Sequence, residues 1–178
     1  MNCAICCSNG KETAVWATKR FKKEDGLSID TDKEDTMLAI EKVAILKAAS
    51  IFKETPGSVL ASVAAIVKEV TLEAHETFIK QGDPSAEMYL VVEGEVEAVM
   101  NGTSIIKLGP GKTVGELGIF NQETRSADVR TLAPTLLFSI ERDALNQLMA
   151  DRPEIARGII GALSLRIREQ GQLMSEAG

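Results

Sequence analysis

The amino-acid sequence predicts a mainly β domain with helices at both ends, in which the strands form a closed or sandwiched antiparallel structure such as a jelly roll. Apolar residues follow a helical period from Thr36 to about Ala49, and again from Arg142 onward. Between Lys68 and Ile140 the period changes to two, and short alternating segments are separated by glycine-rich turns. Many short strands at close spacing are typical of β-barrels and β-sandwiches.

Two helices are expected before the strands. The first runs to about Ala49, and the apolar residues on one of its faces are Met37, Leu38, Ile40, Ile45 and Leu46. The second begins at Thr55-Pro56, with Thr55 as the N-cap and Pro56 as the first helical residue. Its buried stripe consists of Leu60, Val63, Ile66 and Val67.

The alternating segments predict seven or eight strands. We expect them at residues 70–72, 77–80, 88–93, 95–99, 104–108, 125–130 and 135–140. Asn101-Gly102 predicts a type I′ turn that joins two of these strands as a hairpin.

Two helices are expected after the strands, and a tail before the domain. One helix covers residues 142–150, and a longer one starts at Asp151-Arg152-Pro153 with Asp151 as its cap. The longer helix carries Ile155, Ile159, Leu163 and Ile167. Residues 1–35 show no sustained period and are expected to form a flexible tail and linker, so the domain proper spans residues 36–178.

Charge and hydropathy restrict the partners and the location. Residues 36–178 hold fourteen Lys and Arg against nineteen Asp and Glu, and such an acidic domain repels the phosphate backbone of a nucleic acid. No run of eighteen apolar residues is present, so no membrane-spanning helix is expected. The N-terminus lacks the features of a signal peptide, and a cytoplasmic location is therefore expected.

The three cysteines lie at the N-terminus, at Cys3, Cys6 and Cys7. A structural zinc site needs four ligands, and the only histidine is distant, at His75, so we expect no metal and favour free thiols. The alternative is S-acylation, supported by a basic run at Lys19, Arg20, Lys22 and Lys23. Both interpretations remain open.

One constellation has the chemistry of a ligand site. It consists of Gly115-Glu116-Leu117-Gly118 followed by Arg125-Ser126-Ala127. Gly115 permits unusual backbone angles, and a short helical turn from Glu116 would point free N–H groups at an anion. Arg125 can give a charge-assisted hydrogen bond to the same anion, and the Glu116 carboxylate can accept one from a sugar hydroxyl. A purely structural alternative is that Glu116 and Arg125 pair with each other across a loop.

These residues resemble the phosphate-binding cassette of cyclic-nucleotide-binding domains, which reads roughly F-G-E-L-A-L, a short gap and then P-R-[ATS]-A. Here the cassette reads VGELGIF at residues 114–120 and RSADVR at 125–130. The upstream segments FIKQGD at 78–83 and MYLVVEGEV at 88–96 look like the first glycine-marked strands of the family. The resemblance covers about residues 37–170 and implies an eight-stranded antiparallel jelly-roll β-barrel with N- and C-terminal helices.

The resemblance also implies roles for the cassette. Glu116 would bind the ribose 2′-hydroxyl, and Arg125 would bind the exocyclic phosphate oxygens. The remaining ligand-binding positions would be Gly115, Leu117, Gly118, Ser126 and Ala127. The chain departs from the family pattern at Gly118, where alanine is usual, and at Thr124, where proline is usual. The second departure loosens the loop before Arg125.

The function implied is that of a sensor domain, not an enzyme. A threonine after the cassette arginine favours cGMP in this family, and Ser126 occupies that position here, so cAMP is the expected ligand and cGMP remains open. The C-terminal helix is expected to cover the base near Leu173 and Met174, with Gly171 as a hinge, and to pass its movement to an unknown effector. A homodimer through this helix is left open.

The relation to an effector has two interpretations. The chain ends at Gly178, so we expect no helix-turn-helix after the long helix and no binding to nucleic acid. Residues 148–160 look like those of domains attached to HEAT-repeat or transporter-like bacterial proteins. The alternative to a sensor is therefore an interaction module of the same fold that has lost its ligand and belongs to a larger protein of that kind.

Overall fold

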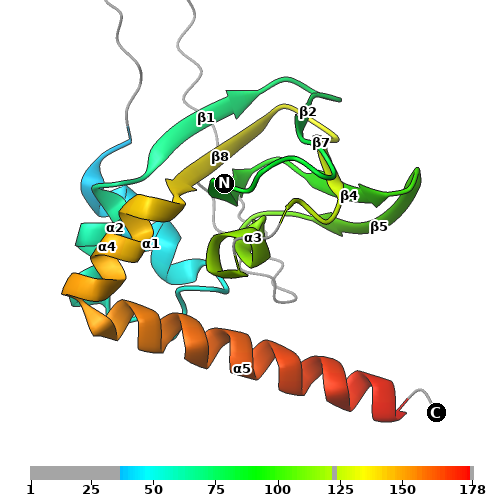
Figure 1. Ribbon diagram of the computed structural model, residues 1–178. Coiled ribbons are helices and arrows are strands. Elements are labelled where there is room, and N and C mark those ends of the chain that lie inside the picture. Colours follow the sequence, from blue (N-terminus) through cyan, green and yellow to red (C-terminus); the bar gives the residue numbers. More distant parts are fainter. Residues whose placement is uncertain (1–36, 122–123, 177–178) are drawn as a thin grey trace, which may run out of the picture. The chain divides into compact units, whose positions relative to one another are not determined.

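Residues 37–121 and 124–176 are described by a computed structural model, and within them eight strands form two antiparallel four-stranded sheets (Figure 1). This arrangement confirms the predicted jelly roll with helices before and after it. The expected tail at residues 1–35 lies outside the described residues.

Each sheet takes its strands from distant parts of the sequence. The first sheet has the order β1 (Lys68–Leu72), β8 (Thr135–Glu141), β3 (Glu87–Glu93) and β6 (Thr113–Val114). The second has the order β2 (Thr77–Ile79), β7 (Asp128–Thr131), β4 (Val96–Met100) and β5 (Thr103–Leu108). β5 is therefore an edge strand, and β8 lies in the interior of its sheet.

The hairpin between β4 and β5 follows the sequence closely. Asn101 and Gly102 have φ angles of 50° and 79°, and a type I′ turn requires positive φ at both central residues. The turn sets the register in which Met100 pairs with Thr103 and Val96 with Leu108.

The first two helices differ in detail from the expectation. α1 spans Ala39–Ala48, so Met37 and Leu38 precede it, and Leu38 and Ile40 are exposed. α2 spans Gly57–Ala64, and its N-cap is Pro56, so the assignment of Thr55 as the cap is wrong. Thr55 is fully buried against Gly158, where its hydroxyl finds no hydrogen-bond partner in the described structure.

The last two helices are α4 (Arg142–Asp151) and α5 (Pro153–Glu176), and α5 passes along one side of the roll (Figure 1). Asp151 is the last residue of α4, so its assignment as the cap of the longer helix is wrong. Arg152 separates the helices with an extended φ of −135°, because a helix cannot continue through the ring of Pro153.

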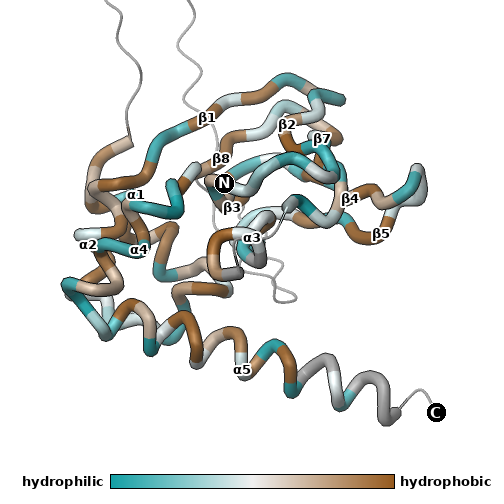
Figure 2. Tube along the Cα trace, in the orientation of Figure 1, coloured by the Kyte–Doolittle hydropathy of each residue, from teal (hydrophilic) through white to brown (hydrophobic). Residues whose placement is uncertain are grey.

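Two apolar clusters hold these elements together. The larger one joins the helices to the first sheet and includes Phe52, Leu60, Phe138 and Ile155. The smaller one lies between the sheets and consists of Ile79, Val91, Val96, Val114, Val129 and Leu137. β5 lies at the outer edge of the second sheet and carries a hydrophobic stretch (Figure 2), of which Ile105 and Ile106 are exposed and belong to neither core.

Candidate functional site

In the chain, the predicted cassette follows β6 of the first sheet and precedes β7 of the second. β6 ends at Val114, Gly115 has a φ of +78°, and the short helix α3 (Glu116–Asn121) follows at once. A Cβ atom on Gly115 would lie 2.1 Å from Nη1 of Arg125 and 3.2 Å from the carbonyl oxygen of Glu87. Both the backbone angle and the available space therefore require glycine at this position.

Arg125 lies in an irregular segment before β7, not on a strand as expected. β7 begins at Asp128, because the backbone of Arg125 is taken up by the turn at residues 82–83. The N–H of Arg125 donates to the carbonyl of Asp83, and the N–H of Gly82 donates to the carbonyl of Arg125. The N···O distance is 2.9 Å in both bonds. These two bonds fix the start of the Arg125 side chain.

The guanidinium of Arg125 points back toward Gly115. Nη2 donates to the carbonyl oxygen of Glu87 at a distance of 2.6 Å, and Nη1 lies 3.4 Å from the carbonyl oxygen of Gly115. Burial lowers the pKa of Arg125, while the nearby Tyr89, Glu87 and Asp83 act in the opposite direction. Arginine nonetheless keeps its charge in proteins, so a half-buried cation lies beside the start of α3.

Glu116 pairs with the C-terminal helix. Its side chain is nearly buried, and Oε1 accepts a hydrogen bond of 2.8 Å from Nη1 of Arg166 on α5. Arg125 instead donates to backbone carbonyls, so the alternative in which Glu116 and Arg125 pair across a loop is wrong for the described structure.

The other predicted cassette positions surround these two side chains in the sequence. Gly118 is buried within α3, and Leu117 belongs to the same helix. Ser126 is exposed and Ala127 half-buried, directly after Arg125. A hydrogen bond thus brings Arg125 to Gly115, and Glu116 follows Gly115 in the chain and contacts Arg166. Ser126 and Ala127 are near Arg125 through the chain alone.

A polar network behind Arg125 was missed by the sequence reasoning. The Glu87 carboxylate accepts hydrogen bonds from the hydroxyls of Tyr89, over 2.7 Å, and of Ser139, over 3.0 Å. Burial and the bond to Glu87 raise the pKa of Tyr89 to about 12. The alternation of β3 carried a usable signal, because it places Glu87 on the same face as Val91 in the core between the sheets.

Arg166 was also missed, and the sequence holds no local signal for it. It lies on α5, fifty residues beyond Glu116 in the sequence. Only the tertiary arrangement brings the two together.

Among the described residues, no group of three or more His, Cys, Asp and Glu side chains could hold a metal ion. None of the helices in that part of the chain has the length and hydropathy needed to cross a membrane.

The cassette lies in a segment that matches a known protein family. Residues 69–152 match the family model described as the cyclic nucleotide-binding domain. This span runs from β1 to the end of α4 and includes the whole segment from Gly115 to Ala127. Residues 69–152 belong to the cyclic-nucleotide-binding domain family. The resemblance seen in the sequence is thereby confirmed.

Similar proteins carry this domain in different settings. The chain is 27% identical over 137 residues to a CRP-like cAMP-activated global transcriptional regulator of Mycobacterium tuberculosis, with 74% of this chain and 61% of the regulator covered. It is 30% identical over 115 residues to a lysophospholipase of Aspergillus oryzae, with 61% of this chain and 8% of that enzyme covered. The chain thus spans about three fifths of the regulator's length, and the family occurs both in regulators and beside enzymes.

A solved structure has the same fold as this chain. The N-terminal domain of a transcriptional regulator from Streptomyces coelicolor A3(2) superposes with a TM-score of 0.64 at 26% identity. The match covers 72% of this chain and 95% of the other. The described helices and strands of this chain therefore have the same fold as that N-terminal domain.

Proposed function

We propose that this chain is a regulatory domain that binds cAMP at the cassette and catalyses no reaction. The main support is the position of Arg125 beside Gly115 and Glu116. Its Nη1 lies 3.4 Å from the Gly115 carbonyl oxygen, at the start of α3. A cation, free helical N–H groups and a nearly buried carboxylate are then available to one small ligand.

Each group meets a different part of a cyclic nucleotide. Arg125 donates to the exocyclic phosphate oxygens, which accept more strongly than the carbonyls that it contacts in the described structure. Glu116 accepts from the ribose 2′-hydroxyl. The close backbone approach of the phosphate is provided by Gly115, Leu117, Gly118, Ser126 and Ala127.

The Glu116–Arg166 ion pair supports coupling to α5. The Glu116 carboxylate that accepts from the ribose hydroxyl also pairs with Arg166, so the ligand and α5 interact with the same carboxylate. Ligand binding shifts the position of α5 only if the bound and free arrangements differ in their contacts with it. The end of α5, near Leu173 and Met174, then covers the base, and an effector senses the movement.

The base preference follows from Ser126. Threonine at this position provides the usual contact with guanine in the family, and serine lacks the methyl group that holds such a hydroxyl in one orientation. We therefore expect cAMP to bind at least as tightly as cGMP.

The outer face of α5 supports a homodimer of this domain. Ile160 and Ile167 are separated by two helical turns and are 62% and 69% exposed. Burial of such a stripe against a second copy would stabilise a dimer. Sedimentation of the wild type and of Ile167→Glu tests this point, because a dimer through α5 becomes monomeric in the variant.

Calorimetric titration of two cassette variants tests the proposal. Charge-assisted hydrogen bonds contribute about 1.5–3 kcal/mol, so Arg125→Ala should weaken cAMP binding roughly 10- to 100-fold. Glu116→Gln should reduce the preference for cAMP over its 2′-deoxy analogue. Arg152→Ala, at an exposed arginine between α4 and α5, is the matched control.

Equal affinity in wild type and Arg125→Ala would overturn the assignment of the phosphate site. Truncation after Gly171 tests separately whether the end of α5 covers the base, because loss of the helix end should then weaken binding of both nucleotides. If the intact chain binds neither nucleotide, the interaction module becomes the better description of the domain.

A further inference from the structure

The carboxylate of Glu87 is a charged group beside the cassette that the proposed ligand contacts do not use. Its Oε2 accepts two hydrogen bonds, from the hydroxyl of Tyr89 at a distance of 2.7 Å and from that of Ser139 at 3.0 Å. The backbone carbonyl oxygen of the same residue accepts from Nη2 of Arg125 at 2.6 Å. Glu87 therefore contacts the cassette arginine through its backbone, while its charged group is bound to two hydroxyls.

The Glu87 carboxylate and Arg125 form no ion pair in the part of the chain that the structure describes. Burial lowers the pKa of Arg125, and the nearby Tyr89 and Glu87 raise it, so the carboxylate lies within electrostatic reach of the guanidinium. An arginine binds a carboxylate more strongly than a neutral carbonyl, because both partners are then charged. The guanidinium would therefore be stabilised by exchanging a carbonyl oxygen for this carboxylate.

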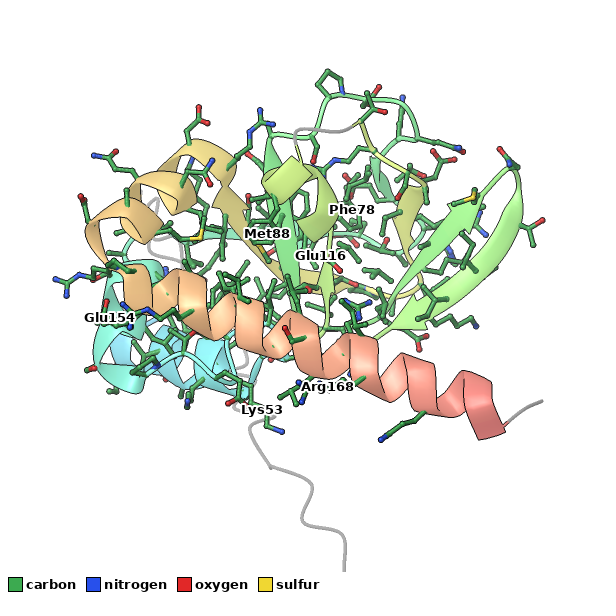
Figure 3. The ribbon with its side chains drawn as sticks, turned by 60° about the horizontal axis from the view of Figure 1, so that its bottom comes forward. Lys53, Phe78, Met88, Glu116, Glu154 and Arg168 are labelled. Atoms are coloured by element: carbon green, nitrogen blue, oxygen red, sulfur yellow. The ribbon has the colours of Figure 1, made fainter. Side chains whose placement is uncertain are left out.

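The two hydroxyls that bind the carboxylate are held in place by the fold. Ser139 on β8 is 2% exposed and lies opposite Tyr89 in the pairing of β8 with β3. The Tyr89 ring packs edge-on against the ring of Phe78, with the two centroids 5.2 Å apart. Figure 3 shows Phe78 among the strands, whereas Glu154 and Arg168 mark the course of α5. The network thus belongs to the strands of the roll.

Other charged groups near Glu87 are engaged or exposed. Lys68 forms an ion pair with Glu141, and Asp83 is exposed, so that water and salt screen its charge. Arg125 has no carboxylate partner among the residues that the structure describes. A Glu87 carboxylate that is released from the two hydroxyls would therefore pair with Arg125.

We propose that Tyr89 and Ser139 are positioning residues for the nucleotide site, which hold the Glu87 carboxylate away from Arg125 and keep the guanidinium free for the phosphate. This inference deepens the function proposed above and rests on it. Without the two hydroxyls, the carboxylate turns to Arg125 and competes with the phosphate for the same N–H donors. Because a partly exposed ion pair must then be broken on binding, the affinity for cAMP should fall about two- to five-fold.

The first experiment measures cAMP affinity by calorimetry in the full chain and in two variants. The double variant Tyr89→Phe, Ser139→Ala removes both hydroxyls but keeps the aromatic ring that packs on Phe78. The triple variant adds Glu87→Gln, which removes the competing charge and should restore the wild-type affinity. Equal affinity of the double variant and the wild type would overturn the proposal. A loss that Glu87→Gln does not restore would also overturn it, because the hydroxyls would then have a structural role only.

Ser104→Ala is the matched control for the lost hydroxyls. The hydroxyl of Ser104 donates to the carboxylate of Glu97 at a distance of 2.9 Å, and this carboxylate also binds Arg130 in the second sheet. Its removal frees no carboxylate near Arg125, so the affinity for cAMP should not change. Melting curves confirm that all variants fold. A loss in Ser104→Ala as large as that in the double variant would contradict the proposal.

A measurement without nucleotide separates this inference from the proposed function. The ¹⁵N chemical shift of Nε in Arg125 should change in the double variant and return toward the wild-type value in the triple variant. If this pattern appears while cAMP binds to none of the proteins, the proposed function fails and the positioning role stands. If the shift is the same in the wild type and the double variant, the positioning role fails whether or not cAMP binds.

Discussion

β8 and β5 are strands of similar apolar content in very different surroundings. β8 lies inside its sheet, between β1 and β3, and its Leu137, Phe138 and Ile140 are fully buried. β5 forms an edge, and its Ile105 and Ile106 are 53% and 47% exposed. The first strand completes the core of the domain, whereas the second presents apolar surface that the described chain leaves uncovered.

α5 shows the same contrast along one helix. Ile155 and Ile159 near its start are buried in the core, while Leu165 and Ile167 further along are exposed. Arg166, between these two exposed residues, pairs with Glu116 of the cassette. The contrast shows that the start of α5 is held by the core of the domain, whereas its later part keeps apolar side chains in contact with solvent.

The largest expected effect is a difference in the free energy of unfolding between variants of β8 and variants of β5. Phe138→Ala should lower the free energy of unfolding by about 3–5 kcal/mol, because it removes a fully buried ring from the larger core. Ile106→Ala should change it by about 0.5 kcal/mol or less, as is usual at exposed positions. Urea unfolding measures both. A large loss in Ile106→Ala would show that β5 contributes to the core and would break the comparison.

The next effect concerns ligand affinity. Gly115→Ala should weaken cAMP binding about as much as Arg125→Ala, roughly 10- to 100-fold, because the added Cβ displaces the guanidinium. Gly102→Ala is a matched control, since Gly102 also has a positive φ, of +79°, but has no atom within 4 Å of the added Cβ. Calorimetry that finds equal losses in both variants would attribute the effect to backbone strain alone.

A smaller effect appears in alkaline solution. The fold raises the pKa of Tyr89 to about 12, so it favours the neutral phenol. The stability that this group contributes is complete below pH 10 and is lost as the pH rises through about 12. Tyr89 is the only tyrosine in the sequence, so absorbance at 295 nm follows its ionisation directly. An apparent pKa near the ordinary value of about 10 would mean that the network around Glu87 is open to water.

The smallest effect is expected at the N-terminus. Residues 1–30 lack a core-forming pattern, so their deletion should leave the melting temperature and the cAMP affinity nearly unchanged. A marked fall in the melting temperature would show that this segment packs on the domain.

Local features of this molecule could be predicted from sequence. The alternation of residues 88–93 and the turn at Asn101-Gly102 depend on neighbours in the chain, and the structure confirms them. The Gly115 conformation belongs to this class too, because a strand, a glycine and a helical turn follow one another directly.

Features set by tertiary contacts were missed or misassigned. Thr55 has the chemistry of a cap, but close packing against Gly158 buries it instead. Arg125 continues an alternating pattern, yet its backbone bonds to the turn at Asp83 rather than to a strand. The partner of Glu116 is Arg166, on a helix fifty residues further along the chain, and no local sequence pattern predicts such a contact.

Titration of the intact chain with cAMP, with 5′-AMP as a non-cyclic control, tests the central claim most directly. The arrangement of Gly115, Glu116 and Arg125 predicts saturable one-site binding of cAMP, clearly tighter than that of 5′-AMP. The absence of binding at millimolar cAMP, or equal affinity for the two nucleotides, would contradict the assignment of the cassette as a cyclic-nucleotide site.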